Sequence, residues 1–378
     1  MKPASLLIAV KRCFRFQEAG LVGVILVLGL LLTVFGGSVN VPVFTMNSDG
    51  IRERVMKPNS QGELEPVSTT RNTFLNAKNL TQLAKDTSFI AIMAVGATIV
   101  IISGGIDLSV GAIYALASVV GAMVLHQFGP DGSSTQTSHL LGVTLGIAAC
   151  IGTATLCGLF NGGMTVVLRV HPFIITLGTM AIYRGIAFVL TNGQSIGGFP
   201  ESFRNVVQWE IGENLSVVPL LITVVVGLLG VIFLGSLAEG RRVYAIGGNE
   251  LASRYSGIRV ERVKLLVFVI AGLVAGLSAV LSLGYYGAAT SGDGQGYELN
   301  VIAAAVIGGA SLAGGKGTAL GAVLGALIIQ MINSGIVILR IDQNYSQIII
   351  GAVVIIAVML DQVNAWLERR RLTTTASR

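Results

Sequence analysis

A polar segment between two long apolar runs carries the side chains with the clearest chemical meaning in this sequence. It reads Gly240-Arg-Arg-Val-Tyr-Ala-Ile-Gly-Gly-Asn-Glu-Leu-Ala-Ser-Arg-Tyr-Ser-Gly-Ile258. Asn249 can accept hydrogen bonds from the free N–H groups of a following turn, and Gly257 can take the left-handed conformation that ends a helix. The spacing predicts a helix over 250–256. A helix this short is marginal alone in water, so we expect a docking partner to hold it.

The same segment has a face suited to contact. Leu251 and Tyr255 are four residues apart and therefore share one side of the predicted helix. Glu250 and Arg254 would flank this side with charge. Such a face fits the groove of another protein, and the alternative is a short amphipathic helix lying on the membrane or on loops of its own chain.

Two glycine-rich turns interrupt apolar segments elsewhere, Gly104-Gly-Ile-Asp-Leu-Ser-Val-Gly111 and Gly308-Gly-Ala-Ser-Leu-Ala-Gly-Gly-Lys-Gly-Thr318. Paired broken helices of this kind point to a transport pathway. Asp107 in the first turn is costly inside a membrane unless it is capped, paired or wetted. We expect Asp107, helped by Ser109, to cap a helix that begins at Leu108. Direct contact of Asp107 with cargo or an ion is the alternative.

The second turn has the glycines of a phosphate-binding loop but not its spacing. Ala310 occupies the place of the first glycine, and Lys316 is followed by Gly317 where Ser or Thr is required. The sequence therefore predicts no nucleotide site here, so any energy from ATP would have to come from a separate subunit. An intramembrane serine protease using Ser311 is the enzymatic alternative. It needs a base, and Lys316 is the candidate because no histidine follows His171.

The amino-acid composition indicates whether these segments lie in water or in a membrane. Of 378 residues, 53% are hydrophobic and 12% are charged, and the mean hydropathy is +0.77. A soluble domain carries about 25% charged residues. Runs such as 90–102 and 220–234 are apolar on every face, which excludes the alternation of a membrane β-barrel. The fold class is therefore all-α, a polytopic membrane protein.

About ten transmembrane helices are predicted, some of them short or broken. They span residues 20–37, 82–103, 108–126, 140–165, 172–191, 216–236, 262–285, 299–312, 317–339 and 346–360. We interpret the first as a retained anchor and not as a cleaved signal peptide. The glycines at 317, 321 and 325 lie on one helix face, which indicates close helix packing.

Charge sets the expected orientation. With both termini in the cytoplasm, most of the 25 basic residues lie on the inside. The whole chain, 1–378, then forms one transmembrane domain with a long external loop over 38–81, a cytoplasmic loop over 237–262 and a cytoplasmic tail over 362–378. Prolines and charges in the external loop favour a flexible segment, with a cap over the protein as the alternative. The basic residues lie at the ends of apolar segments and are not interleaved with aromatics, so nucleic acid is not a predicted partner. The scattered cysteines and histidines predict no metal site.

Four ordered motifs give the sequence a family resemblance. They are Gly104-Gly-Ile-Asp-Leu-Ser-Val-Gly111, Thr191-Asn-Gly193, the stretch Ala245 to Ile258, and Gly296-Tyr-Glu-Leu-Asn300 leading into Gly308-Gly-Ala-Ser-Leu-Ala-Gly-Gly-Lys-Gly317. Over residues 79–361 the sequence resembles the membrane permease subunits of bacterial ATP-binding-cassette sugar importers of the ribose/xylose/galactose type. The external loop has no counterpart in this resemblance.

The resemblance implies a function and a set of partners. Two permeases pair, as a homodimer or a heterodimer, and two ATPase cassettes that hold ATP and Mg²⁺ bind them from the cytoplasm. A periplasmic binding protein delivers a monosaccharide, which crosses the inner membrane by alternating access. The permease itself then binds no cofactor. The polar segment becomes the coupling helix, with Asn249, Glu250, Leu251, Arg254, Tyr255 and Gly257 as coupling residues. The expected pathway residues are Asp107, Ser109, Asn192, Glu298, Asn300 and Ser311.

Three questions stay open at this point. The cargo can be a pentose, a hexose or a sugar-like signalling molecule, since specificity in such importers resides mainly in the binding protein. An ion-coupled transporter using Asp107 is an alternative to the cassette importer. The intramembrane protease using Ser311 is the alternative from a different class of function.

Overall fold

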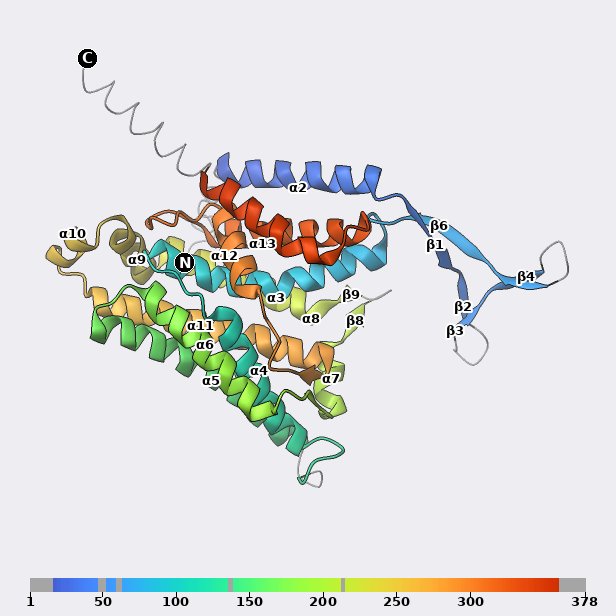
Figure 1. Cartoon of the computed structure of the whole chain (residues 1–378), viewed down its shortest axis with the longest axis horizontal. Coiled ribbons are helices and arrows are strands. Elements are labelled where there is room, and N and C mark those ends of the chain that lie inside the picture. Colours follow the sequence, from blue (N-terminus) through green and yellow to red (C-terminus); the bar gives the residue numbers. More distant parts are fainter. Residues whose placement is uncertain (1–15, 47–51, 59–62, 135–138, 212–214, 360–378) are drawn as a thin grey trace, which may run out of the picture.

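The computed structural model describes residues 16–46, 52–58, 63–134, 139–211 and 215–359, and it shows a bundle of helices with thin paired strands extending from one end (Figure 1). Eight helices in this part of the chain are long and apolar enough to cross a membrane. They are α2 (Phe16–Phe35), α3 (Ala77–Ile102), α4 (Val110–Gln127), α5 (His139–Leu168), α6 (Pro172–Thr191), α8 (Val217–Ser236), α11 (Val260–Tyr286) and α13 (Ala319–Ile338). Two shorter apolar helices, α12 (Tyr297–Ile307) and Gln343–Met359, complete the set. Each predicted span corresponds to one of these ten, so the predicted all-α membrane fold is confirmed.

Helix α3 forms the centre of the bundle. Nearly all of its membrane-spanning length is buried, and it packs against α8, α11, α12 and α13. The outer helices α5, α6 and α8 bury less than a third of their spans. Their exposed side chains are mostly apolar, which suits contact with lipid.

Small residues bring the helices close together, as the glycine pattern predicted. A Cβ added to Gly321 would lie 2.0 Å from the carbonyl oxygen of Gly308, and one added to Gly325 would lie 2.0 Å from that of Ala304. Helices α12 and α13 therefore touch through backbone atoms. Gly317 does not belong to this helix face as predicted. It precedes Thr318, the N-cap of α13, and has a φ of +147°.

The predicted external loop over 38–81 contains paired strands. Strand β1 (Ser38–Pro42) pairs with β6 (Ser68–Asn72), β2 (Phe44–Met46) with β3 (Arg52–Arg54), and β4 (Met56–Pro58) with β5 (Leu64–Pro66), all antiparallel. We name this structure, residues 38–72, the β-arm. It extends away from the bundle (Figure 1). Prolines and charges in this segment favoured a flexible loop, but an exposed two-stranded ribbon tolerates both, so the strands were not predicted.

The base of the β-arm is tied to two helices. The Asn72 side chain donates to the Thr33 carbonyl at 2.8 Å and accepts from the N–H of Leu75 at 2.8 Å. The Asn76 side chain then accepts from the N–H of Asn79 and caps α3, which begins at Ala77. Residues 77–81, at the end of the predicted loop, therefore belong to helix α3.

The two ends of the bundle differ in character. Helix α2 begins at the end that carries α9 (Ala238–Gly248) and α10 (Glu250–Tyr255) and runs to the β-arm at the other end (Figure 1). The β-arm end also carries α7 (Glu201–Val207) and the small strand pairs β7 (Ile196–Gly197) with β10 (Ala288–Ala289) and β8 (Glu210–Ile211) with β9 (Leu215–Ser216). The α9–α10 end is the one that charge counting predicts to be cytoplasmic.

Candidate functional site

Helix α10 begins where the sequence predicted. The side-chain oxygen of Asn249 accepts a hydrogen bond from the N–H of Ala252 at 2.9 Å. Asn249 is extended, with φ of −160°, as an N-cap residue should be. The predicted cap is therefore present in the structure.

The end of α10 is equally well defined. Gly257 has φ of +81°, the left-handed conformation predicted for it. The N–H of Ile258 donates to the Ser253 carbonyl and the N–H of Gly257 to the Arg254 carbonyl, both at 3.1 Å. These two bonds make up a Schellman motif, which closes the helix after Tyr255.

Sequence reasoning missed the helix α9 that precedes α10. Leu237 is extended and separates α9 from α8, so the chain leaves the membrane span and turns into a second short helix. Val243 and Ile246 of α9 are buried, three residues apart on one face. This spacing was the available signal, but three glycines and two arginines in the same stretch suggested a loop.

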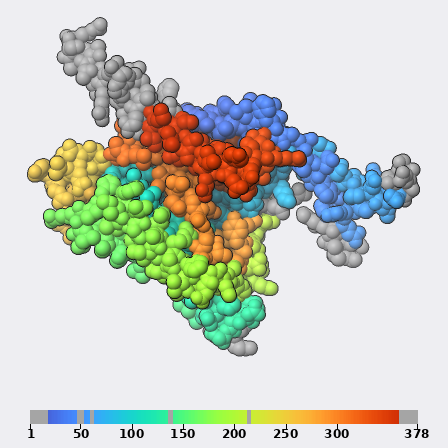
Figure 2. Space-filling model, viewed as in Figure 1, coloured from blue at the N-terminus to red at the C-terminus, as the bar shows by residue number. Residues whose placement is uncertain are grey.

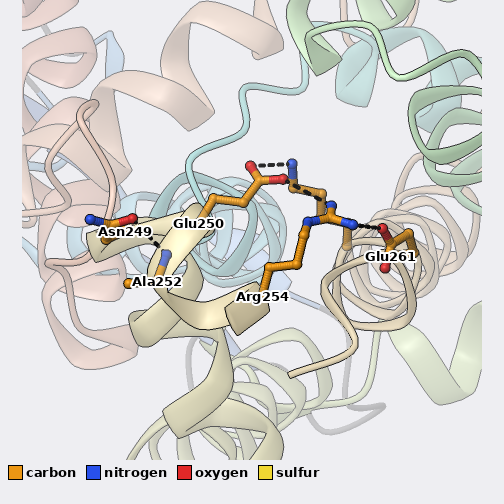
Figure 3. A network of polar contacts seen from close by, with 6 residues as sticks. Asn249, Glu250, Ala252, Arg254 and Glu261 are labelled. Carbon is orange, nitrogen blue, oxygen red and sulfur yellow. Dashed lines mark hydrogen bonds and ion pairs between the residues drawn. The ribbon is translucent and has the colours of Figure 1, made fainter. Parts of the chain in front are cut away.

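Ion pairs tie α10 to the start of α11 (Figure 3). Glu250 accepts from Lys264 at 2.7 Å and lies 3.6 Å from Arg254, which itself pairs with Glu261 at 2.5 Å. The hydrogen bond that Arg254 donates to Glu261 raises the pKa of Arg254, which stays charged. Glu250 and Arg254, predicted to present charge to a partner, are thus engaged with their own chain and position the helix.

Leu251 and Tyr255 remain uncovered beside these ion pairs on α10. Their exposed fractions are 67% and 88%. The segment that carries them forms the tip of the molecule at the α9–α10 end (Figure 2). The structure thus presents one leucine and one tyrosine on a short helix that capping and ion pairs hold in place.

Three of the four motifs meet at the last turn of α9. A Cβ added to Gly247, in the last turn of α9, would lie 1.7 Å from the carbonyl oxygen of Ile102 and 2.5 Å from the backbone nitrogen of Gly315. The N–H of Gly315 donates to that same Ile102 oxygen at 2.9 Å. A Cβ added to Gly314 would lie 3.2 Å from the Cα of Gly104. We name this contact of α9, the end of α3 and the α12–α13 turn the glycine junction.

A side-chain bond strengthens the glycine junction. The Tyr244 hydroxyl of α9 donates to the Gly317 carbonyl at 2.7 Å. Only residues without a side chain allow three backbones to approach this closely. Any displacement of α9 therefore acts on both broken-helix turns at once.

The prediction for Asp107 is wrong in its detail. Helix α4 begins at Val110, and Ser109 at the N-cap makes no side-chain capping bond. The Asp107 carboxylate instead accepts from the backbone N–H of Ser109 at 2.8 Å and from the Ser109 hydroxyl at 2.6 Å. This local turn competes with capping and delays the helix by two residues.

Asp107 also starts a buried chain of hydrogen bonds across three helices. The Asn161 amide of α5 donates to the Ser109 hydroxyl at 2.8 Å, and the Tyr183 hydroxyl of α6 donates to the Asn161 oxygen at 3.1 Å. Asp107, Ser109 and Asn161 are all buried. The satisfied carboxylate thus has a structural role in joining α4, α5 and α6.

This network gives a first prediction. Asp107→Asn keeps an acceptor oxygen for Ser109, so the variant should fold and transport at close to the wild-type level. Asp107→Ala leaves the buried N–H and hydroxyl of Ser109 without their acceptor and should lower the free energy of unfolding by about 2 kcal/mol. Thermal unfolding of the purified protein and uptake by intact cells measure the two effects. Loss of uptake in a stable Asp107→Asn protein would instead support ion coupling at this carboxylate.

The remaining predicted pathway residues do not lie together. Asn192 is exposed and ends α6 in the left-handed conformation, with φ of +50°. Ser311 is buried in the α12–α13 turn, where its N–H donates to the Lys316 carbonyl at 3.1 Å. The Oε2 atom of Glu298 is buried without a hydrogen-bond partner among the described residues, and a Cβ added to Gly111 would lie 2.5 Å from it.

Asn300 lines a cavity of about 470 Å³ at the β-arm end of the bundle. Helices α3, α11, α12 and α13 and the start of the last helix form its walls. Its polar lining includes Asn79, Gln82, Asp86, Asn300, Gln330 and Asn333, and its aromatic lining is Phe89, Tyr286 and Tyr297. Of these lining residues, only Asn300 was among the predicted pathway residues. The available signal was the polar spacing i, i+3, i+7 at the start of α3.

Comparison with known proteins decides the family. Residues 79–358 match the family described as "Branched-chain amino acid transport system / permease component". The chain belongs to this family of permeases. It is 38% identical to the ribose import permease protein RbsC of Escherichia coli K12, over 78% of this chain and 89% of that one.

The names of further relatives also describe import or transport permeases. The D-allose transport system permease protein AlsC of Escherichia coli K12 is 39% identical, over 76% of this chain and 85% of its own. The autoinducer 2 import system permease protein LsrC of Photorhabdus laumondii is 31% identical, over 78% and 84%. No solved structure matches the permease. The resemblance inferred from four motifs is thereby confirmed, and the permease is a multi-pass protein of the inner membrane.

The family match begins at Asn79. Helix α2 and the β-arm lie before it, whereas the glycine junction, α10 and the cavity lie within it. The features that can carry transport therefore belong to the part of the permease shared with its relatives.

Proposed function

We propose that the permease is the membrane-spanning subunit of an ATP-driven importer that carries a monosaccharide into the cell by alternating access. The observation that carries this proposal is the similarity to ribose and allose import permeases over three quarters of the chain. A pentose, a hexose or a sugar-like signalling molecule remains open as the cargo. The relatives give no support to an ion-coupled transporter or to a protease.

The partners follow from the same proposal. Two ATPase cassettes hold ATP and Mg²⁺ and bind the end that carries α10, a periplasmic sugar-binding protein docks at the β-arm end, and a second permease copy or a paralogue completes the pore. The exposed Leu251 and Tyr255 are suited to a groove on the cassette. The permease contributes no nucleotide site of its own.

The glycine junction explains how a push at α10 reaches the membrane. Helix α10 is tied to α11 by ion pairs and follows α9 directly, and α9 contacts the end of α3 and the α12–α13 turn. Packed backbones without intervening flexible side chains transmit displacement with little loss. A cassette that moves α10 would therefore shift the ends of three membrane helices together.

Reconstitution tests the proposal. Vesicles that contain the permease, with the cassette and binding protein encoded by neighbouring genes, should take up radiolabelled D-ribose or D-allose only when ATP is present on the cassette side. Vesicles with the permease alone should take up neither sugar. Uptake by the permease alone under a proton or sodium gradient would overturn the proposal, and so would cleavage of a membrane peptide that Ser311→Ala abolishes.

A further inference from the structure

We propose that the cavity at the β-arm end is a monosaccharide-binding site within the permease, formed by amides, one carboxylate and aromatic rings. This inference rests on the proposed function. The site would hold the cargo after the binding protein releases it at the β-arm end and before it reaches the glycine junction at the other end. The cavity volume of about 470 Å³ is within the range of small-molecule sites.

The first wall is a polar face on α3. Asn79, Gln82 and Asp86 recur at intervals of three and four residues, so they lie on one side of the helix. The Gln82 amide donates to both oxygens of Asp86 at 2.9 and 3.0 Å. Lys85 is buried and donates to the Gln82 oxygen at 2.6 Å, which fixes the orientation of that amide. Asp86 keeps further acceptor positions for hydroxyl groups.

The opposite wall offers amides with few firm partners. The Asn333 oxygen accepts from the Ser346 hydroxyl at 2.9 Å, but the Asn333 amide reaches the Gln330 oxygen only at 3.4 Å. The Ser334 hydroxyl likewise reaches the Asn79 oxygen only at 3.4 Å. The side-chain amide of Asn300 has no hydrogen-bond partner within the described parts of the chain. Polar side chains are costly in membrane helices unless they are satisfied or used. This set is thus suited to a ligand with many hydroxyl groups.

Aromatic rings complete the site. Phe89 and Tyr286 pack with ring centroids 5.9 Å apart, and Tyr297 at the start of α12 lines the same space. An aromatic face covers the C–H face of a sugar ring, while the amides and the carboxylate reach its hydroxyl groups. The lining residues include no lysine or arginine. A neutral sugar therefore fits this site better than a phosphorylated one.

Two variants and a matched control test the site. Asn300→Ala removes an amide without breaking a described hydrogen bond, and Asp86→Asn keeps the shape of the carboxylate but removes its charge. Asn344→Ala is the control, because Asn344 is exposed at the same end and does not line the cavity. Binding of radiolabelled D-ribose and D-allose to the purified permease, without binding protein, is measured beside ATP-dependent uptake by the reconstituted importer.

We expect each site variant to weaken sugar binding about tenfold and to slow uptake, with thermal unfolding unchanged and the control like the wild type. D-ribose 5-phosphate should bind more weakly than D-ribose. Importers with normal uptake whose permease binds no sugar, or whose Asn300→Ala and Asp86→Asn variants behave as wild type, would overturn the site and leave the proposed function standing. Absence of ATP-dependent uptake by the wild-type importer would contradict the proposed function itself.

Discussion

Replacing Gly247 by alanine is expected to abolish most transport. The new methyl group would lie 1.7 Å from the backbone oxygen of Ile102 and 2.5 Å from the backbone nitrogen of Gly315. Neither atom belongs to a flexible side chain, so α9 has to move away from the bundle. We expect a loss of roughly 3 kcal/mol in the free energy of unfolding, as for a strongly overpacked contact. Uptake should fall at least about tenfold because the link from α10 to α3 is broken.

The neighbouring residue supplies a control. A Cβ added to Gly248 would meet no atom within 4 Å, so Gly248→Ala should be stable and active. Both variants would be compared in uptake by the reconstituted importer and in thermal unfolding of the purified permease. Equal uptake and equal stability of the two variants would show that the close backbone contact at Gly247 is absent from the protein.

Removing the side chains of Leu251 and Tyr255 is expected to uncouple the cassette without unfolding the permease. Both residues are exposed, at 67% and 88%, so their truncation costs little in the isolated protein. Buried anchors of an interface are worth roughly 2 kcal/mol each, or about thirtyfold in affinity. The double variant Leu251→Ala, Tyr255→Ala should therefore fail to retain the cassette and should show no ATP-driven uptake.

An exposed leucine on another helix controls for the loss of apolar surface. Leu228, on the outer helix α8, is exposed at 57%, so Leu228→Ala should retain both cassette and uptake. Co-purification with the cassette and cassette ATPase activity are the measurements. Normal co-purification and normal uptake by the Leu251, Tyr255 double variant would contradict the assignment of α10 as the coupling helix.

Local rules account for what the sequence predicted well. All ten spans were predictable because a membrane requires long apolar helices and tolerates few charges. The cap at Asn249 and the left-handed turn at Gly257 depend only on neighbouring backbone groups, so their residue types were sufficient evidence. The prediction that Asp107 caps a helix was wrong because two local arrangements compete for its carboxylate. The turn in which it accepts from Ser109 is the one that forms.

Tertiary packing accounts for the rest. Helix α9 forms because Val243 and Ile246 are buried against the bundle, although its glycines are poor helix formers. The glycine junction and the cavity each combine segments that are far apart in the sequence. Asn79, Asn300 and Asn333 share a cavity only because α3, α12 and α13 meet at the same end. One sequence shows the polar residues but not which of them become neighbours.

Strand pairing in the β-arm limits how its length can change during evolution. Its strands pair antiparallel from Ser38 opposite Asn72 outward, and the family match starts only at Asn79. An insertion of one residue in a single strand would reverse the facing of every side chain beyond it, whereas one residue in each strand preserves the alternation. The arm can therefore grow or shrink by matched pairs while its Asn72 base stays fixed. Length differences among close relatives within the paired strands β1 and β6 should accordingly be even numbers.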